Sequence, residues 1–162
     1  MFKLNFNSTL NLVLIFSLIA IISAYFIEYV LGYQPCNLCL IERIPYVLSI
    51  ILIVFNYIFK KDEKFIILLL ILIFVFSFLI SVYHFGIEQG FFEESSVCGL
   101  KNGANIISKE ELLNLLSQKT ISCKDVTFMV FGLSLTSINM IISLIITSLL
   151  IKTYNTNEKN EL

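Results

Sequence analysis

The sequence predicts an all-α membrane protein, a four-helix transmembrane bundle with one long polar loop that carries a short amphipathic helix. Of its 162 residues, 57% are hydrophobic and only 14% are charged, whereas a soluble domain has about 45–50% apolar and about 25% charged residues. Four apolar stretches also approach the roughly 20 residues that a helix needs to cross about 30 Å of hydrocarbon. Helices are expected because they satisfy their own backbone polar groups in lipid.

These stretches predict a single integral membrane domain that covers residues 1–162. The predicted spans cover about residues 10–31, 40–59, 65–85 and 126–151. The first stretch is longer than the roughly 7–15-residue apolar region of a cleaved signal peptide, so we expect it to be retained. The second span carries Pro45 in its opening turns, where the missing N–H of proline costs least.

The connections between the spans are residues 32–39, the short loop 60–64 and a long polar excursion, 86–125. Within the excursion, Ser108 and Glu111 form a capping box, and Ile107 and Leu112 are placed to form its hydrophobic staple. The leucines that follow predict a short amphipathic helix ending near Lys119. We expect this helix to lie on the membrane surface, with packing against the end of the bundle alone as the alternative.

Positive charges predict the orientation of the spans. Near span ends and in short loops, five lysines lie on the side of the two termini and the 60–64 loop, against Arg43 and Lys124 on the other side. Because such charges stay in the cytoplasm, we expect cytoplasmic termini and periplasmic loops at 32–39 and 86–125, in a bacterial inner membrane. All four cysteines then face the periplasm, where disulfides persist. The net charge of −1 gives no basis for nucleic-acid binding.

Cys36 and Cys39 form a CxxC pair just before the second span. A cysteine near a helix N-terminus meets unpaired N–H groups and the positive end of the helix dipole, which favour the thiolate. Arg43 follows Cys39 by four residues, about one helical turn. Its charge can therefore lower the pKa of Cys39 further and stabilise negative charge on a bound acceptor. Alternatively, Arg43 reaches the lipid headgroups and pairs with Glu42 or lipid.

Cys98 and Cys123 are the remaining cysteines, and 24 residues of the polar excursion lie between them. Structural zinc sites with four cysteines typically consist of two close pairs, so no metal is expected here. One close pair and one distant pair suggest electron transfer between dithiols beside a lipid-soluble carrier. Two inert structural disulfides are the alternative.

His84 is the only histidine, and it lies at the outer end of the third span in Tyr83-His84-Phe85-Gly86. A neutral imidazole at that depth can donate a hydrogen bond to a carbonyl oxygen of a ligand. We therefore treat His84 as a candidate ligand-binding residue, with a simple polar tip at the membrane boundary as the alternative.

Three segments of the chain resemble a known family. Residues 32–43, GYQPCNLCLIER, are similar to the PCxLCxxxR entry to the second span of bacterial disulfide bond formation protein B (DsbB). Residues 83–88, YHFGIE, and the following Cys98 resemble that family's third span and loop. Residues 121–126, ISCKDV, lead to FGLSL at 131–135, which resembles its second loop cysteine and last helix. The resemblance covers about residues 20–140; Val130 and the absence of tryptophan are departures that concern packing.

The resemblance implies a quinone-dependent thiol:disulfide oxidoreductase that reoxidises a periplasmic DsbA-type thioredoxin-fold oxidase, using ubiquinone or menaquinone. The partner's thiolate attacks a Cys98–Cys123 disulfide at Cys98, and the released Cys123 then attacks Cys36. Cys39, freed as thiolate, donates electrons to the quinone. Arg43 and His84 are the residues implied to hold the quinone carbonyl oxygens.

Two other classes of protein compete with this interpretation. A four-span adaptor or scaffold would use structural disulfides to hold its outer loops, but the short loop between Cys36 and Cys39 makes a poor structural staple. An enzyme like vitamin K epoxide reductase also couples a CxxC pair to quinone, but its active pair lies in a late span. The sequence does not distinguish a general DsbB from a paralogue with a dedicated partner.

Overall fold

The computed structural model describes residues 6–59, 63–93, 122–124, 128–130 and 132–160. Its helices are α1 (Phe6–Tyr29), α2 (Asn37–Ile41), α3 (Ile44–Phe59), α4 (Glu63–Glu88) and α6 (Leu135–Asn160). Within the described residues, four helical segments are long and apolar enough to cross a membrane: α1, α2 with α3, α4, and α6. The predicted all-α four-helix transmembrane bundle is confirmed. The amphipathic helix predicted near residues 108–119 lies outside the described residues.

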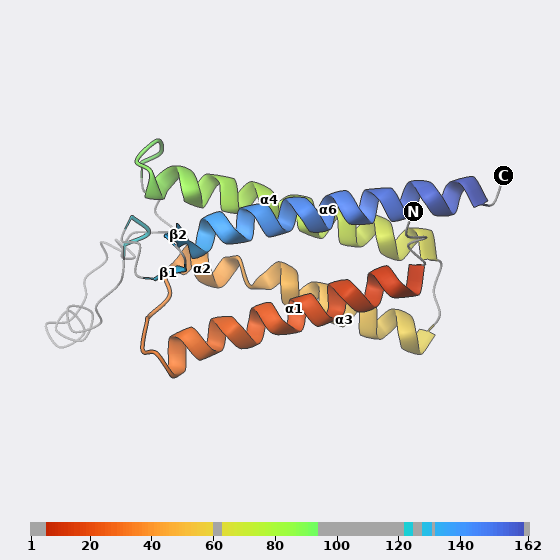
Figure 1. Ribbon diagram of the computed structural model, residues 1–162, viewed down its shortest axis with the longest axis horizontal. Helices are drawn as coiled ribbons and strands as arrows, with labels where there is room; N and C mark the ends of the chain where they lie inside the picture. Colours follow the sequence, from red (N-terminus) through yellow and green to blue (C-terminus); the bar gives the residue numbers. More distant parts are fainter. Residues whose placement is uncertain (1–5, 60–62, 94–121, 125–127, 131, 161–162) are drawn as a thin grey trace, which may run out of the picture.

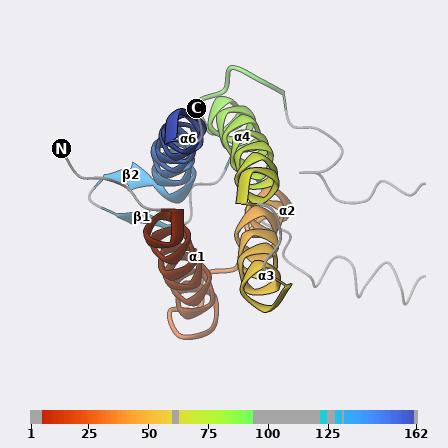
Figure 2. The same ribbon diagram turned by 90° about the vertical axis from the view of Figure 1, so that its right-hand side faces the viewer.

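The four long helices form a bundle with a square cross-section (Figure 2). Helix α1 packs against α3 and α6, and α4 packs against the same two neighbours. Successive spans run in opposite directions, so the start of α1, the end of α3, the start of α4 and the end of α6 lie at one end (Figure 1). Helix α2 and the connection from α1 lie at the other end, which we call the cysteine end of the bundle.

A short β-hairpin precedes the last helix. Strand β1 (Met129–Val130) pairs antiparallel with β2 (Leu133–Ser134). Gly132 lies in the turn with φ = 81°, a left-handed conformation that two-residue hairpin turns favour and that glycine adopts without strain. Helix α6 therefore begins at Leu135, later than the boundary near residue 126 that hydrophobicity predicts for the last span.

The helix of the second span is interrupted after one turn. Residues Glu42 and Arg43 separate α2 from α3, and Pro45 is the second residue of α3. A proline at this position fits because its missing N–H belongs to the first turn, where backbone donors lack helical partners. At this interruption, Glu42 contacts His84 of α4 and Arg43 contacts Glu28 of α1.

Polar side chains join the helices inside an otherwise apolar bundle. Hydroxyl pairs link Ser17 of α1 with Ser49 of α3 at 2.9 Å, and Ser77 of α4 with Ser143 of α6 at 3.0 Å. Large apolar side chains such as Phe74 fill the centre, whereas many others on the outside of the helices are exposed. This distribution is expected for helices that meet lipid on one side and associate through small polar residues on the other.

Candidate functional site

The CxxC pair lies at the start of α2. Cys36 is the N-cap residue, and its sulfur accepts the backbone N–H of Cys39 at 3.2 Å. The two Sγ atoms are 2.6 Å apart, and both cysteines are free. Cys36 is buried, whereas Cys39 is partly exposed. The two sulfurs therefore lie close enough to form a disulfide.

The surroundings of Cys36 favour its thiolate. The hydrogen bond from the side chain of Cys39, together with the hydrogen bond and charge of His84, lowers the pKa of Cys36 to about 5, against the opposing effect of burial. The thiolate is thus the main form of Cys36 above about pH 5 and is lost as the pH falls through that value.

The ring of His84, on α4, contacts the sulfur of Cys36. Its Nε2 atom lies 3.5 Å from Cys36 Sγ, and its Nδ1 atom lies 3.2 Å from Glu42 Oε1. Both His84 and Glu42 are buried, at 1% and 8% exposure. A histidine ring held between a thiol and a carboxylate is an arrangement that can accept or return a proton.

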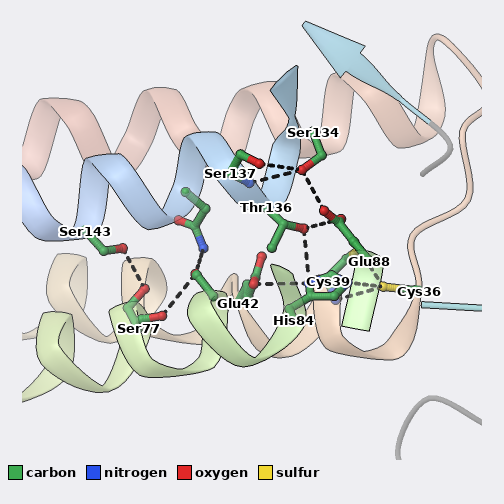
Figure 3. A network of polar contacts seen from close by, with 12 residues as sticks. Cys36, Cys39, Glu42, Ser77, His84, Glu88, Ser134, Thr136, Ser137 and Ser143 are labelled. Carbon is green, nitrogen blue, oxygen red and sulfur yellow. Dashed lines mark hydrogen bonds and ion pairs between the residues drawn. The ribbon is translucent and has the colours of Figure 1, made fainter. Parts of the chain in front are cut away.

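The polar network continues from His84 to a second carboxylate (Figure 3). Thr136 Oγ1 lies 3.2 Å from His84 Nδ1 and donates to Glu88 Oε1 at 2.7 Å. Ser134 donates to the other carboxylate oxygen of Glu88, also at 2.7 Å. Glu88 is the last residue of α4 and is partly exposed. The network thus connects a buried sulfur to the end of the bundle.

Cys39 faces a different environment, an apolar cavity of about 310 Å³ between α1, the α2–α3 segment and α6. Arg43, Tyr46 and Asn139 also line it, with aliphatic side chains of α1 and α6. Ligand pockets for small organic molecules have about this volume or more and are mostly apolar with a few polar groups. A flat, mostly apolar organic molecule fits such a site, with Cys39 and Arg43 in its wall.

Arg43 is held at the rim of this cavity by α1. Its Nη1 atom forms an ion pair with Glu28 Oε2 at 2.6 Å, and its guanidinium carbon lies 5.3 Å from the centre of the Tyr25 ring. The side chains of Arg43 and Glu28 are 16% and 21% exposed. The guanidinium therefore has a fixed position and does not extend freely to the headgroups.

Cys123 of the second pair lies close to the first. It is 2% exposed and packs in one cluster with Cys36, Leu38 and Ile87. Cys123 is disulfide-bonded, and Cys98, its partner by resemblance, lies outside the described residues. The cluster thus brings Cys123 and Cys36 to the same part of the cysteine end, as thiol–disulfide exchange between the two pairs requires.

A metal is a poor fit to the same residues. One ligand atom each from Cys36, Cys39 and His84 lies within 4.8 Å of the others. Two sulfurs at a tetrahedral zinc ion with bonds of about 2.3 Å would be about 3.7 Å apart, whereas these lie 2.6 Å apart. The arrangement fits a reacting dithiol better.

The structure divides the residues predicted from the sequence into two groups. Cys39 and Arg43 share the cavity, whereas the described residues that line it include neither Cys36 nor His84. The sequence interpretation missed Glu28, Glu88 and Thr136, and it considered Glu42 only as a partner of Arg43. Ionisable residues within apolar spans usually have functional or structural partners, and this signal alone would have singled out Glu28 and Glu42.

Comparisons with known proteins agree with the dithiol geometry. The family model of disulfide bond formation protein DsbB matches residues 7–153. An uncharacterized protein of Rickettsia prowazekii (strain Madrid E), RP370, is 31% identical over 140 residues, which cover 83% of this chain and 80% of that protein. No solved structure matches the chain. The chain belongs to the DsbB family of disulfide bond formation proteins, and it is a multi-pass membrane protein with the thiol oxidoreductase chemistry of that family.

Proposed function

We propose that the protein reoxidises a periplasmic DsbA-type thiol oxidase and passes the electrons to a respiratory quinone. The observation that carries this proposal is the position of the CxxC pair, with Cys39 in the wall of an apolar cavity and Cys36 in one packed cluster with Cys123. One sulfur can therefore exchange with the second cysteine pair while the other faces a lipid-soluble acceptor. A purely structural disulfide needs neither contact.

In the proposed cycle, the thiolate of the partner attacks the Cys98–Cys123 disulfide at Cys98. Cys123 is released and attacks Cys36, which breaks the Cys36–Cys39 bond and frees Cys39 as a thiolate. Cys39 and Arg43 would hold a quinone in the cavity, where it would take up two electrons and two protons and leave as quinol. The second thiolate of the partner closes the partner's own disulfide and releases Cys98, which re-forms the bond to Cys123 and frees Cys36. Cys36 then re-forms the bond to Cys39 as two electrons leave Cys39 for the acceptor.

The requirement for a quinone follows from the direction of electron flow. DsbA-type oxidases have a known potential of about −120 mV, well above that of ordinary thiol pools. Reoxidation of such a partner therefore needs a stronger acceptor than another dithiol. A quinone dissolved in the bilayer can enter a cavity formed between membrane helices.

The proposed orientation places the cysteine end of the bundle in the periplasm of a bacterial cell with this protein in its inner membrane. The termini and the loop at residues 60–64 are then cytoplasmic. The lysine excess on that side supports this orientation. The soluble partner meets the protein on the periplasmic side, where disulfides persist.

The direct test is a reconstituted reaction. Purified protein is mixed with a reduced DsbA-type oxidase and a soluble ubiquinone or menaquinone analogue, and partner disulfide and quinol are both measured. We expect one disulfide for each quinol formed. Oxidation of the partner without quinol formation, or no reaction with either quinone, contradicts the proposed function and favours an adaptor with structural disulfides.

Replacement of Arg43 by methionine is expected to raise the apparent KM for quinone by roughly tenfold to a hundredfold. A charge-assisted contact of this kind is worth about 1.5–3 kcal/mol. The guanidinium is the only positive charge among the described residues that line the cavity. The measurement is quinol formation at saturating partner and varied quinone concentration. Lys152→Met at the far end of α6 is the matched control, and an unchanged KM in folded Arg43→Met assigns Arg43 to the ion pair with Glu28 alone.

A further inference from the structure

Hydrogen bonding around His84 assigns the proton on its ring. Thr136 donates its hydroxyl proton to Glu88, so its oxygen is left to accept from His84 Nδ1. An ionised Glu42 can only accept, and it faces the same nitrogen. The proton of a neutral ring therefore lies on Nδ1. Nε2 keeps its lone pair, which faces the sulfur of Cys36 at 3.5 Å.

We propose that His84 is the base that takes the proton of Cys36 and that Thr136 and Glu88 carry a proton from the ring to the end of the bundle. The proton of the Cys36 thiol moves to Nε2, and the Nδ1 proton moves to the hydroxyl oxygen of Thr136 as that hydroxyl gives its own proton to Glu88. Glu42 lies against Nδ1 and stabilises the positively charged ring between the two transfers.

This route deepens the proposed function and rests on it for its place in the cycle. When fully reduced protein closes the Cys36–Cys39 disulfide, the two thiols together lose two protons and two electrons, and one S–S bond forms. The quinone takes up both electrons and two protons, so no further reactant is required. The proton of Cys36 passes from Glu88 into the aqueous phase. The quinone takes up another proton from the aqueous phase in its place.

The positions of the two sulfurs explain why Cys36 needs a proton relay. Glu42 and Thr136, which contact the His84 ring, also line the cavity. Cys39 opens onto the cavity, but Cys36 is 6% exposed and does not line it. Cys36 and Glu42 are the ionisable groups that contact His84 in the described part of the chain, and α6 adds only the neutral Thr136 on this side. Glu88 is the first partly exposed group along the network. A buried thiol must lose its proton through such a chain or remain protonated.

The first test measures the acidity of Cys36 without quinone or partner. Fully reduced protein is treated with iodoacetamide over a range of pH, and alkylation of Cys36 is followed by peptide mass spectrometry. In the wild type the rate should fall as the pH drops through about 5. In His84→Gln, which keeps a polar side chain but no base, we expect the midpoint to rise by about one pH unit or more. An unchanged midpoint overturns the assignment of His84 as the base.

The second test separates the proton route from a merely structural contact. Thr136→Val removes the relay hydroxyl and is expected to slow quinol formation by prereduced protein about tenfold or more at saturating quinone. Because Thr136 also lines the cavity, a change confined to the KM for quinone overturns the relay. Thr147→Val is the matched control, because Thr147 is also buried on α6 but donates only to the backbone oxygen of Ser143. Thr136→Ser should retain the wild-type rate. Equal rates for the two valine variants overturn the relay.

Glu88→Gln gives an independent measurement on the same route. It should slow quinol formation to the same extent as Thr136→Val, and the double variant should be no slower than either single variant, because all three interrupt one path. Additive losses contradict a single path. If wild-type protein forms no quinol, the proposed function fails, whereas the alkylation profile still decides the role of His84.

Discussion

Cys39→Ser is expected to abolish quinol formation by the prereduced protein. Without the second thiol, Cys36 has no partner for an intramolecular disulfide, and the sulfur that faces the cavity is lost. No remaining side chain can replace the missing thiol in this covalent step. The rate of quinol formation should therefore fall by about three orders of magnitude or more, to the rate at which free thiols reduce quinone. Stopped-flow absorbance of the quinone measures this rate directly.

Cys36→Ser is the informative control, because it removes the same disulfide but leaves a sulfur in the cavity wall. Both variants should lose turnover. Only Cys36→Ser should change the absorbance spectrum of added quinone, since a Cys39 thiolate would remain next to the bound ring. Quinol formation by Cys39→Ser, or a spectral change in that variant, would contradict the assignment of Cys39 as the residue that faces quinone.

The helical part of the fold could be predicted from the sequence because lipid imposes a simple requirement. A span needs about 20 apolar residues with internally satisfied backbone groups, and length and composition reveal such stretches without knowledge of packing. The hairpin around Gly132 was harder to predict from the sequence. Its residues are as apolar as the helix that follows, and pairing between Met129 and Ser134 depends on tertiary structure.

Part of the candidate site could also be predicted from the sequence, because that part depends on residues close together in the chain. A CxxC pair with an arginine four residues later is a local pattern, so Cys36, Cys39 and Arg43 could be identified from spacing. The contacts of His84 with Cys36 and Thr136 span 48 and 52 residues, and no local pattern encodes them. The role of His84 at the ligand stays a prediction from the sequence, and the fold brings its ring against the sulfur of Cys36.

Cys123→Ser should convert a transient complex with the partner into a stable covalent one. Cys123 is 2% exposed and lies in the cluster with Cys36, so a soluble protein cannot reach it while that packing is kept. The partner must then attack the other cysteine of the pair, which we assign as Cys98. Removing the resolving thiol leaves the resulting mixed disulfide without an internal nucleophile.

The adduct can be generated and measured with purified proteins. The reduced Cys123→Ser variant is mixed with the oxidised DsbA-type protein, which supplies the disulfide that the variant no longer forms. Non-reducing electrophoresis should show most of the variant in a band that disappears on reduction, and wild-type protein should show little of it. The Cys98→Ser/Cys123→Ser double variant should form no such band.

A variant that forms no adduct and still supports partner oxidation would show that Cys123 is only a structural staple. Electrons would then enter at the CxxC pair directly, and the burial of Cys123 beside Cys36 would serve packing alone.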